Sequence, residues 1–259
     1  MGRPVLITGA SSGIGYELAT VCAANQHDLI LIARREERLK DLKGKLESAH
    51  GVQVWTYQGD LTDPPTRQQF FEWTQGLGQT LYALVNNAGF GDVVTFTESD
   101  WDKQEAMLQL NVVALTHLTR LFLPAMVEQK QGRILNVAST AAFLPGPYMA
   151  VYYATKAYVL SFTSAISGEL DGTSVTATTL CPGPTASEFQ ERADMGEAKM
   201  VKGRKLPTAA EVAAYGYKAM MEGEAVAVHG FSNKLLSFAT RFLPRKQLAN
   251  VARDLQKPD

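Results

Sequence analysis

Residues 8–15 read T-G-A-S-S-G-I-G and complete a short apolar run that begins V-L-I at 5–7. Three glycines, Gly9, Gly13 and Gly15, allow the backbone to turn tightly and to approach a ligand closely. If a helix begins here, its free amides and its dipole attract a phosphate group. The cluster alone is equally consistent with an ordinary tight turn, because any short connection between a strand and a helix favours glycine. Its position after the first apolar run favours a phosphate-binding loop.

The remainder of the chain alternates short apolar runs with longer stretches of helical spacing, such as Leu39, Leu42 and Leu46. Runs that are apolar throughout indicate parallel strands covered on both faces. The sequence therefore predicts an α/β fold: a doubly wound parallel sheet of about seven strands with helices on both faces, a Rossmann fold. The predicted strands are residues 5–8, 29–33, 52–57, 81–86, 133–138, 174–181 and 225–228.

Residues 1–230 contain no linker, low-complexity run or further repeat, so we predict that they form a single domain. Residues 231–259 form a C-terminal extension in which basic side chains alternate with leucine and phenylalanine. This pattern favours a helical extension packed on the domain or on a partner subunit. The alternative is an amphipathic helix that makes peripheral contact with an anionic membrane surface.

Composition narrows the class of protein. The formal charge of −1 over 259 residues makes nucleic acid an unexpected partner. Two cysteines, Cys22 and Cys181, are too few for a disulfide scaffold, and no His/Cys cluster predicts a metal site. We also find no apolar segment of membrane-spanning length, so we expect a cytoplasmic protein with no integral membrane contact.

The second predicted strand ends I-L-I-A-R-R-E-E, which places Arg34 and Arg35 at its tip. In dinucleotide-binding folds this tip meets the adenosine ribose, and guanidinium groups match a 2′-phosphate, so the pair favours NADP(H). The alternative is a solvated helix start in which Arg35 and Arg38 serve only solubility. Asp60, after the third strand, can accept from the adenine amino group or can cap a helix, a role that Asp63 also fits.

Polar residues interrupt otherwise apolar segments at three further places. Asn86 and Asn87 end the fourth strand, Asn111 lies in an apolar helix, and Ser139 follows the fifth strand. Each has an ordinary explanation: a turn, a side-chain bond to the helix backbone, or a helix N-cap. Residues 150–158 then read A-V-Y-Y-A-T-K-A-Y, and helical spacing places Tyr152 and Tyr153 equally on the face of Lys156. Spacing alone does not choose between the two tyrosines.

In order along the chain, T-G-A-S-S-G-I-G, N-N-A-G at 86–89, Asn111, Ser139, Y-x-x-x-K at 152–156 and P-G-P-T at 182–185 resemble the short-chain dehydrogenase/reductase family. The resemblance covers about residues 4–230. It implies that Tyr152 is the general acid/base, Ser139 polarises the substrate oxygen and Asn111 organises a proton-relay water. Lys156 would lower the pKa of Tyr152, while Tyr153 and Tyr158 would pack rather than react.

The resemblance also implies an NADP(H)-binding, carbonyl-reductase-type domain over residues 1–230 and a homo-oligomer. The cofactor-binding residues that it implies are Gly9, Ser11, Ser12, Gly13, Ile14, Gly15, Arg34, Arg35, Asp60, Leu61, Asn87, Ala88, Gly89, Tyr152, Lys156, Pro182, Gly183 and Thr185.

Substrate walls are expected from Phe90, Gly91, residues 141–149 and residues 186–207. These segments are mostly apolar, so we predict a small-molecule substrate that is a hydrophobic carbonyl or alcohol. Residues 184–207 have no clean helical stripe and are predicted to form a substrate lid rather than an ordinary surface insertion. The alternative function is a catalytically silent NADP-binding sensor or scaffold.

Overall fold

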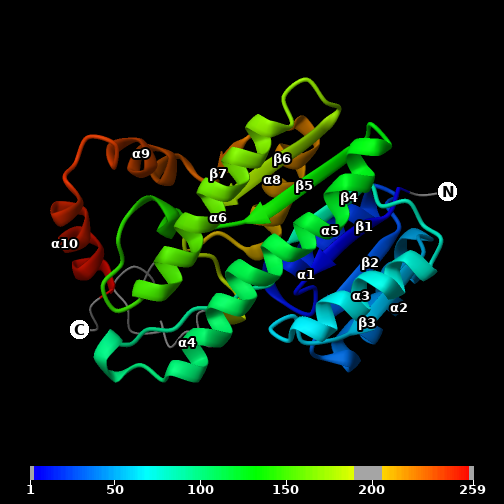
Figure 1. Ribbon diagram of the computed structural model, residues 1–259, viewed down its shortest axis with the longest axis horizontal. Helices are drawn as coiled ribbons and strands as arrows, with labels where there is room; N and C mark the ends of the chain where they lie inside the picture. Colours follow the sequence, from blue (N-terminus) through cyan, green and yellow to red (C-terminus); the bar gives the residue numbers. More distant parts are fainter. Residues whose placement is uncertain (1–2, 190–205, 257–259) are drawn as a thin grey trace.

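The computed structural model describes residues 3–189 and 206–256 and contains one seven-stranded sheet (Figure 1). All of its strand pairs are parallel, in the order β3-β2-β1-β4-β5-β6-β7. This confirms the predicted doubly wound fold. The strands are β1 Val5–Thr8, β2 Leu29–Ala33, β3 Val54–Gln58, β4 Ala83–Asn86, β5 Gly132–Val137, β6 Val175–Cys181 and β7 Val226–Val228.

Helices cover both faces of the sheet because successive strand residues point to opposite sides. Val5 and Ile7 belong to one apolar cluster, while Leu6 between them belongs to the other. The first cluster is covered by α1 Gly13–Ala24, α2 Glu36–His50 and α8 Ala209–Glu222. The second is covered by α3 Pro64–Gly76, α5 Leu115–Glu128 and α6 Ala150–Glu169.

Helix α8 begins with a capping box, in which Thr208 and Glu211 each bond the other's backbone amide. Just before it, the Ala186 amide donates to the Pro207 carbonyl at 2.9 Å. The two ends of the described segments, near Ala186 and Pro207, therefore lie side by side. Residues 190–205 of the predicted lid lie outside the described residues.

A continuous helical run spans Trp101–Glu128 and is long and apolar enough to cross a membrane, with a mean hydropathy of 1.4 in its best window. The expectation that no apolar segment reaches this length is therefore wrong. The run consists of α4 Trp101–Leu108, a π-helical segment η2 at Gln109–Ala114, and α5. Leu118, Phe122 and Met126 of α5 are buried against the sheet, so packing within the domain accounts for the apolar composition of this part of the run.

The C-terminal extension consists of α9 Phe231–Ala239 and α10 Arg245–Gln256, which lie beyond the sheet at the β7 side of the molecule (Figure 1). Helix α10 has a buried side, formed by Leu248, Ala252 and Gln256. Helix α9 differs, because Phe231 is 85% exposed and Phe238 is 56% exposed. The structure thus divides the extension into a packed helix and a helix with an open apolar face.

Candidate active site

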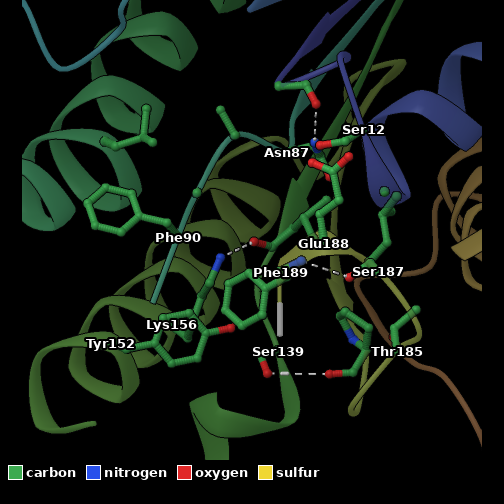
Figure 2. Close-up of a pocket in the computed structure, with 18 of the residues that line it drawn as sticks. Ser12, Asn87, Phe90, Ser139, Tyr152, Lys156, Thr185, Ser187, Glu188 and Phe189 are labelled. Carbon is green, nitrogen blue, oxygen red and sulfur yellow. Dashed lines mark hydrogen bonds between the residues drawn. The ribbon is translucent and has the colours of Figure 1, made fainter. Parts of the chain in front are cut away.

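A cavity of about 740 Å³ lies at the carboxyl ends of the strands, where Figure 2 shows side chains converging from several elements. A ligand crevice is expected at this edge of an open parallel sheet. Of the catalytic and cofactor-binding residues predicted from the sequence, only Gly15 and Asn111 do not line the cavity. Those that line it are Gly9, Ser11, Ser12, Gly13, Ile14, Arg34, Arg35, Asp60, Leu61, Asn87, Ala88, Gly89, Ser139, Tyr152, Lys156, Pro182, Gly183 and Thr185. Of the predicted substrate walls, Phe90, Ala141, Met149 and residues 187–189 line it, whereas Gly91, residues 142–148 and Ala186 do not.

The glycine loop fits an anion. Gly9 and Gly13 have φ values of +67° and +56°, which L side chains rarely adopt, and a Cβ atom at Gly9 would lie 2.9 Å from the Ala88 Cα atom. Ser12 occupies the N-cap position of α1 but makes no side-chain capping bond, and the first turn of α1 contains no acidic residue. The helix N-terminus therefore borders the cavity with a positive dipole end and no carboxylate of its own.

Gly15 has a packing role, and its cofactor contact stays a prediction. A Cβ atom there would lie 2.3 Å from Asn87 Nδ2 and 2.5 Å from the Gly9 carbonyl oxygen. Asn87 Nδ2 donates to the Thr8 carbonyl at 2.9 Å, and Thr8 Oγ1 accepts from the Asn87 amide at 3.0 Å. Gly15 thus leaves room for Asn87 to tie β4 to the glycine loop.

The two arginines at the tip of β2 point to different places. Arg35 donates through Nε to Ser11 Oγ at 3.2 Å and through Nη1 to Glu188 at 2.9 Å. Arg38 also contacts Glu188, whereas Arg34 lies 3.7 Å from Asp60. The structure therefore groups Arg35 with Arg38 rather than with Arg34. Their spacing of three residues at a helix start is the signal by which the sequence could have predicted this pair.

Asp60 does not cap a helix. Its Oδ1 atom accepts from the amide and hydroxyl of Thr62, both at 2.9 Å, which fixes a turn at the cavity edge. Asp63 caps α3 by accepting from the Thr66 amide at 3.1 Å. The structure therefore excludes the role of helix N-cap for Asp60. The role that remains is that of an acceptor for the adenine amino group.

Ser139 and Tyr152 meet at one side of the cavity (Figure 2). Ser139 is the N-cap of the short 3₁₀ segment η3 Thr140–Phe143, where its Oγ atom accepts from the Ala141 amide at 3.1 Å. Its Oγ atom donates to the Pro182 carbonyl at 3.4 Å, and the Tyr152 hydroxyl lies near it. Burial raises the pKa of Tyr152 well above its ordinary value, and the neighbouring Ser139 hydroxyl opposes that rise only in part. The phenol is therefore protonated at neutral pH.

Lys156 lies behind this pair, 5.7 Å from the Tyr152 ring centroid. Its Nζ atom donates to the Val137 carbonyl at 2.8 Å, and burial lowers its pKa to about 8. Burial of the phenol dominates the pKa of Tyr152 in this structure, while the Lys156 ammonium group is engaged by a backbone carbonyl. That Lys156 lowers the pKa of Tyr152 stays a prediction.

Asn111 lies beneath the cavity wall in η2. Its Nδ2 atom donates to the Phe90 carbonyl at 2.9 Å and to Thr155 Oγ1 at 3.1 Å, and its Oδ1 atom accepts from the Phe90 amide at 3.2 Å. The side chain therefore joins the segment after β4 to α6. Protein groups engage both polar atoms of the side chain, and the water-organising role of Asn111 stays a prediction. A π-helical turn at this place is typical of functional sites.

The other two tyrosines of the Y-Y-A-T-K-A-Y stretch have different surroundings. Tyr153 is buried, lines the cavity wall and accepts a hydrogen bond from the Gln256 amide of α10. Tyr158 is 39% exposed, and its hydroxyl bonds Thr116 at 2.9 Å. Tyr153 packs in the interior, whereas Tyr158 packs at the surface of α6, where its ring stacks on Phe162 with a centroid distance of 5.7 Å.

The segment after β6 closes one side of the cavity. Thr185 Oγ1 donates to the Gly183 carbonyl at 2.9 Å, which stabilises the P-G-P-T turn. Phe189 then packs on Tyr152 with a ring-centroid distance of 5.5 Å, and Glu188 reaches the arginines of α2. The sequence interpretation missed Glu188, because its partners lie 150 residues away and no local pattern marks the contact.

A family model for short chain dehydrogenase matches residues 3–198. The chain belongs to the short-chain dehydrogenase family. This oxidoreductase family includes an NADP-dependent 3-hydroxy acid dehydrogenase of Salmonella typhi, which is 36% identical over 183 residues, or 69% of this chain and 71% of that protein.

Two solved structures of related short-chain dehydrogenases have the same fold over almost the whole chain. A short-chain dehydrogenase from Sphingobium yanoikuyae in complex with NADPH has a TM-score of 0.83 at 30% identity, covering 93% of this chain and 94% of that one. A short-chain dehydrogenase/reductase from Burkholderia phymatum in complex with NAD has a TM-score of 0.83 at 25% identity, covering 100% and 98%. Structures of this family therefore include complexes with either nicotinamide cofactor.

Proposed function

We propose that this short-chain dehydrogenase is an NADP(H)-dependent enzyme that interconverts a carbonyl and an alcohol on a hydrophobic substrate. The observation that carries the proposal is the placement of the Ser139 and Tyr152 hydroxyls together in the wall of a cavity that also contains the glycine loop. The pair offers two hydroxyl donors to one substrate oxygen, while the loop offers an anion site at the other end. Substrate and cofactor can therefore meet within one cavity.

The residues present fit a dinucleotide. The uncapped N-terminus of α1 with its positive-φ glycines suits a pyrophosphate. Ser11 and Arg35 suit a 2′-phosphate, which supports NADP(H), as does the NADPH-bound relative. Lys156 would hold the nicotinamide ribose, and Pro182, Gly183 and Thr185 would border the nicotinamide ring.

The bound cofactor supplies a hydride to a carbonyl carbon or removes one from an alcohol. In the reductive direction, negative charge develops on the carbonyl oxygen. The Ser139 hydroxyl donates a hydrogen bond to that oxygen, and the Tyr152 hydroxyl gives it a proton. The Tyr152 phenol is protonated at neutral pH, so it has this proton to give.

Apolar side chains surround this pair of hydroxyls. Phe90, Met149 and Phe189 line the cavity, and Met149 and Phe189 pack in one cluster with Tyr152. A site with few polar groups among apolar walls selects substrates with a hydrophobic body and an oxygen at the reacting carbon. The Salmonella relative is named for 3-hydroxy acids, which carry such an oxygen.

A thermal-shift comparison of NADPH with NADH, followed by an activity panel of ketones, aldehydes and acyl-derived β-keto compounds, tests the proposal. We expect the larger shift with NADPH and steady NADPH oxidation with one or more hydrophobic carbonyls. A larger shift with NADH would overturn the cofactor assignment. Tight NADPH binding without turnover of any carbonyl or alcohol would support the silent sensor or scaffold instead.

We also propose that the protein acts in the cytoplasm as a homo-oligomer. The open apolar face of α9 supports association, since Phe231, Leu235 and Phe238 would be covered by a second copy. Light scattering measures the molar mass of the wild type and of Phe238→Asp, and we expect a smaller species for the variant. Sedimentation with anionic vesicles examines the membrane alternative, and binding that requires α9 would contradict the cytoplasmic assignment.

A further inference from the structure

The arginines at the adenosine end of the cavity already hold an anion that belongs to the protein. Glu188 bonds Arg35 through Oε2 at 2.9 Å and contacts Arg38 through Oε1. Arg35 is held from its other edge by Ser11, with Nη2 donating to Ser11 Oγ at 3.1 Å and to the Ser11 carbonyl at 3.3 Å. Two guanidinium groups that suit a 2′-phosphate thus converge on one carboxylate, and Ser11 holds one of them in place.

We infer that Glu188 is a specificity-determining residue that competes with the 2′-phosphate for Arg35 and Arg38, and so narrows the preference for NADP(H) over NAD(H). The inference rests on the proposed function. A phosphate must exchange with the carboxylate to gain both arginines. The unphosphorylated cofactor carries a hydroxyl at the same position and needs neither guanidinium group; a carboxylate nearby is an acceptor for that hydroxyl.

The charge and exposure of the cluster suit exchange. Arg35 and Arg38 hold the pKa of Glu188 at about 2, so the carboxylate is ionised throughout the physiological pH range. The side chains are partly exposed, at 31% for Arg35, 49% for Arg38 and 33% for Glu188. Ion pairs at this exposure are individually weak, whereas a phosphate brings up to two charges and three acceptor oxygens.

The residues next to Glu188 extend the contact along the cavity. Ser187 lies against the glycine loop, where a Cβ atom at Gly13 would be 3.4 Å from the Ser187 Cβ atom. Phe189 packs on Tyr152 at the reactive end, and Figure 2 shows all three residues between Ser12 and Tyr152. The exchange at Glu188 therefore takes place within a segment that touches both ends of the cavity.

Calorimetric titration with adenosine 2′,5′-bisphosphate and with ADP tests the inference without any catalytic step. For Glu188→Gln, we expect the bisphosphate to bind more tightly, on the order of tenfold, while ADP does not gain affinity. The matched control is Glu37→Gln, which removes the same charge one residue from Arg38. Glu37 pairs with Lys40 instead, so this variant should keep the wild-type ratio.

An unchanged ratio of the two affinities in Glu188→Gln, or an equal gain in Glu37→Gln, would overturn the inference, the second by showing a general charge effect. Melting temperatures of both variants without ligand confirm that they are folded. Failure of the proposed function would look different, because wild-type protein would then bind neither NADPH nor NADH, or would prefer NADH. If the wild type prefers NADPH but Glu188→Gln leaves the ratio of the two affinities unchanged, the proposed function stands and only the role inferred for Glu188 is contradicted.

Discussion

Tyr152 and Tyr153 are neighbours in sequence and both line the cavity, but their hydroxyl groups have different partners. The Tyr152 hydroxyl lies near that of Ser139, and the Tyr153 hydroxyl accepts from Gln256. Tyr152→Phe removes the proposed acid, so we expect turnover to fall about 10²- to 10⁴-fold, the usual contribution of general acid catalysis. NADPH binding, measured by thermal shift, should be retained because the ring remains.

Tyr153→Phe is the control for this change. It should leave most of the activity while lowering the free energy of unfolding by about 1–3 kcal/mol, since the Gln256 amide loses its buried partner. Equilibrium urea unfolding measures the loss. If Tyr153→Phe abolished turnover and Tyr152→Phe did not, the catalytic tyrosine would be the other one.

The buried Lys156 predicts a pH dependence of stability. Its pKa is about 8 in the folded chain against an ordinary 10.5. Between these values the unfolded chain binds more protons than the folded chain, so the stability contributed by this group rises with pH through that window. Below pH 8 the buried ammonium group is charged in both states and remains costly.

Lys156→Met should therefore lack this rise. We expect the wild type to gain free energy of unfolding relative to Lys156→Met between pH 8 and 10, measured by urea titration at several pH values. Lys218→Met changes a lysine that is 72% exposed and serves as the control, whose profile should follow the wild type. Parallel profiles for Lys156→Met and the wild type would contradict the assignment.

For single residues, the sequence predicted which side chains line the cavity better than it predicted which groups those side chains contact. Ser139, Tyr152 and Lys156 could be predicted because each lies at a fixed place in a family motif, and the structure brings all three to the cavity. The raised pKa of Tyr152 could not be predicted, because burial depends on residues far along the chain. The same holds for the contact of Gln256 with Tyr153, which joins positions 103 residues apart.

At the scale of elements, the turn from β1 to α1 depends on a glycine for close packing. In Gly15→Ala, the new methyl group would overlap Asn87 Nδ2 and the Gly9 carbonyl. We expect a loss of about 1–3 kcal/mol in the free energy of unfolding, as for other overpacked sites, and weaker NADPH binding. Urea unfolding and calorimetry measure the two effects.

Gly44→Ala provides the matched comparison in helix α2. No atom lies within 4 Å of a Cβ atom at Gly44, so alanine adds helix propensity without overlap. It should stabilise the protein by about 0.5–1 kcal/mol and leave NADPH binding unchanged. A destabilisation of equal size in both variants would show that glycine matters here for a reason other than the packing of Asn87.

Helix α10 offers a second prediction at this scale, because it supports the cavity wall through Gln256 and Tyr153. Ala252 is 1% exposed, whereas its neighbour Val251 is 44% exposed. Ala252→Asp buries a charge and should detach the helix, raising the KM for the carbonyl substrate with little change in NADPH affinity. Val251→Asp adds the same charge on the open side and should leave both constants unchanged. Equal KM effects in the two variants would contradict this role of α10.

Strands could be predicted from the sequence because buried parallel strands are apolar throughout. β1 and β2 match their predicted bounds, whereas β3 begins at Val54 rather than Val52. The amide of Gln53 instead donates to the Asp28 side chain, a contact that no local pattern shows. The π-helical turn in η2 could not be predicted either, because an apolar segment with one asparagine has the same pattern as a regular helix.

At the scale of the whole molecule, the sheet separates two apolar cores, and the active site lies at one edge of both. Cys22 of α1 belongs to one apolar cluster, and Cys181 belongs to another, smaller cluster at the end of β6. Both thiols are free and buried, and burial raises the pKa of each to about 12. Thiolate is the reactive form, so neither sulfur should react with an alkylating reagent while its surroundings stay closed.

The alkylation rate of each cysteine therefore reports how often the structure around that cysteine opens. In pulsed alkylation followed by mass spectrometry, Cys181, beside Ser139 and Lys156, should be protected further by NADPH than Cys22. Equal protection of both would mean that the chain opens only as a whole, and labelling at the rate of a free thiol would contradict their burial. A preparation that incorporates label at Cys181 alone would reveal loosening at the active-site edge before activity or secondary structure is lost.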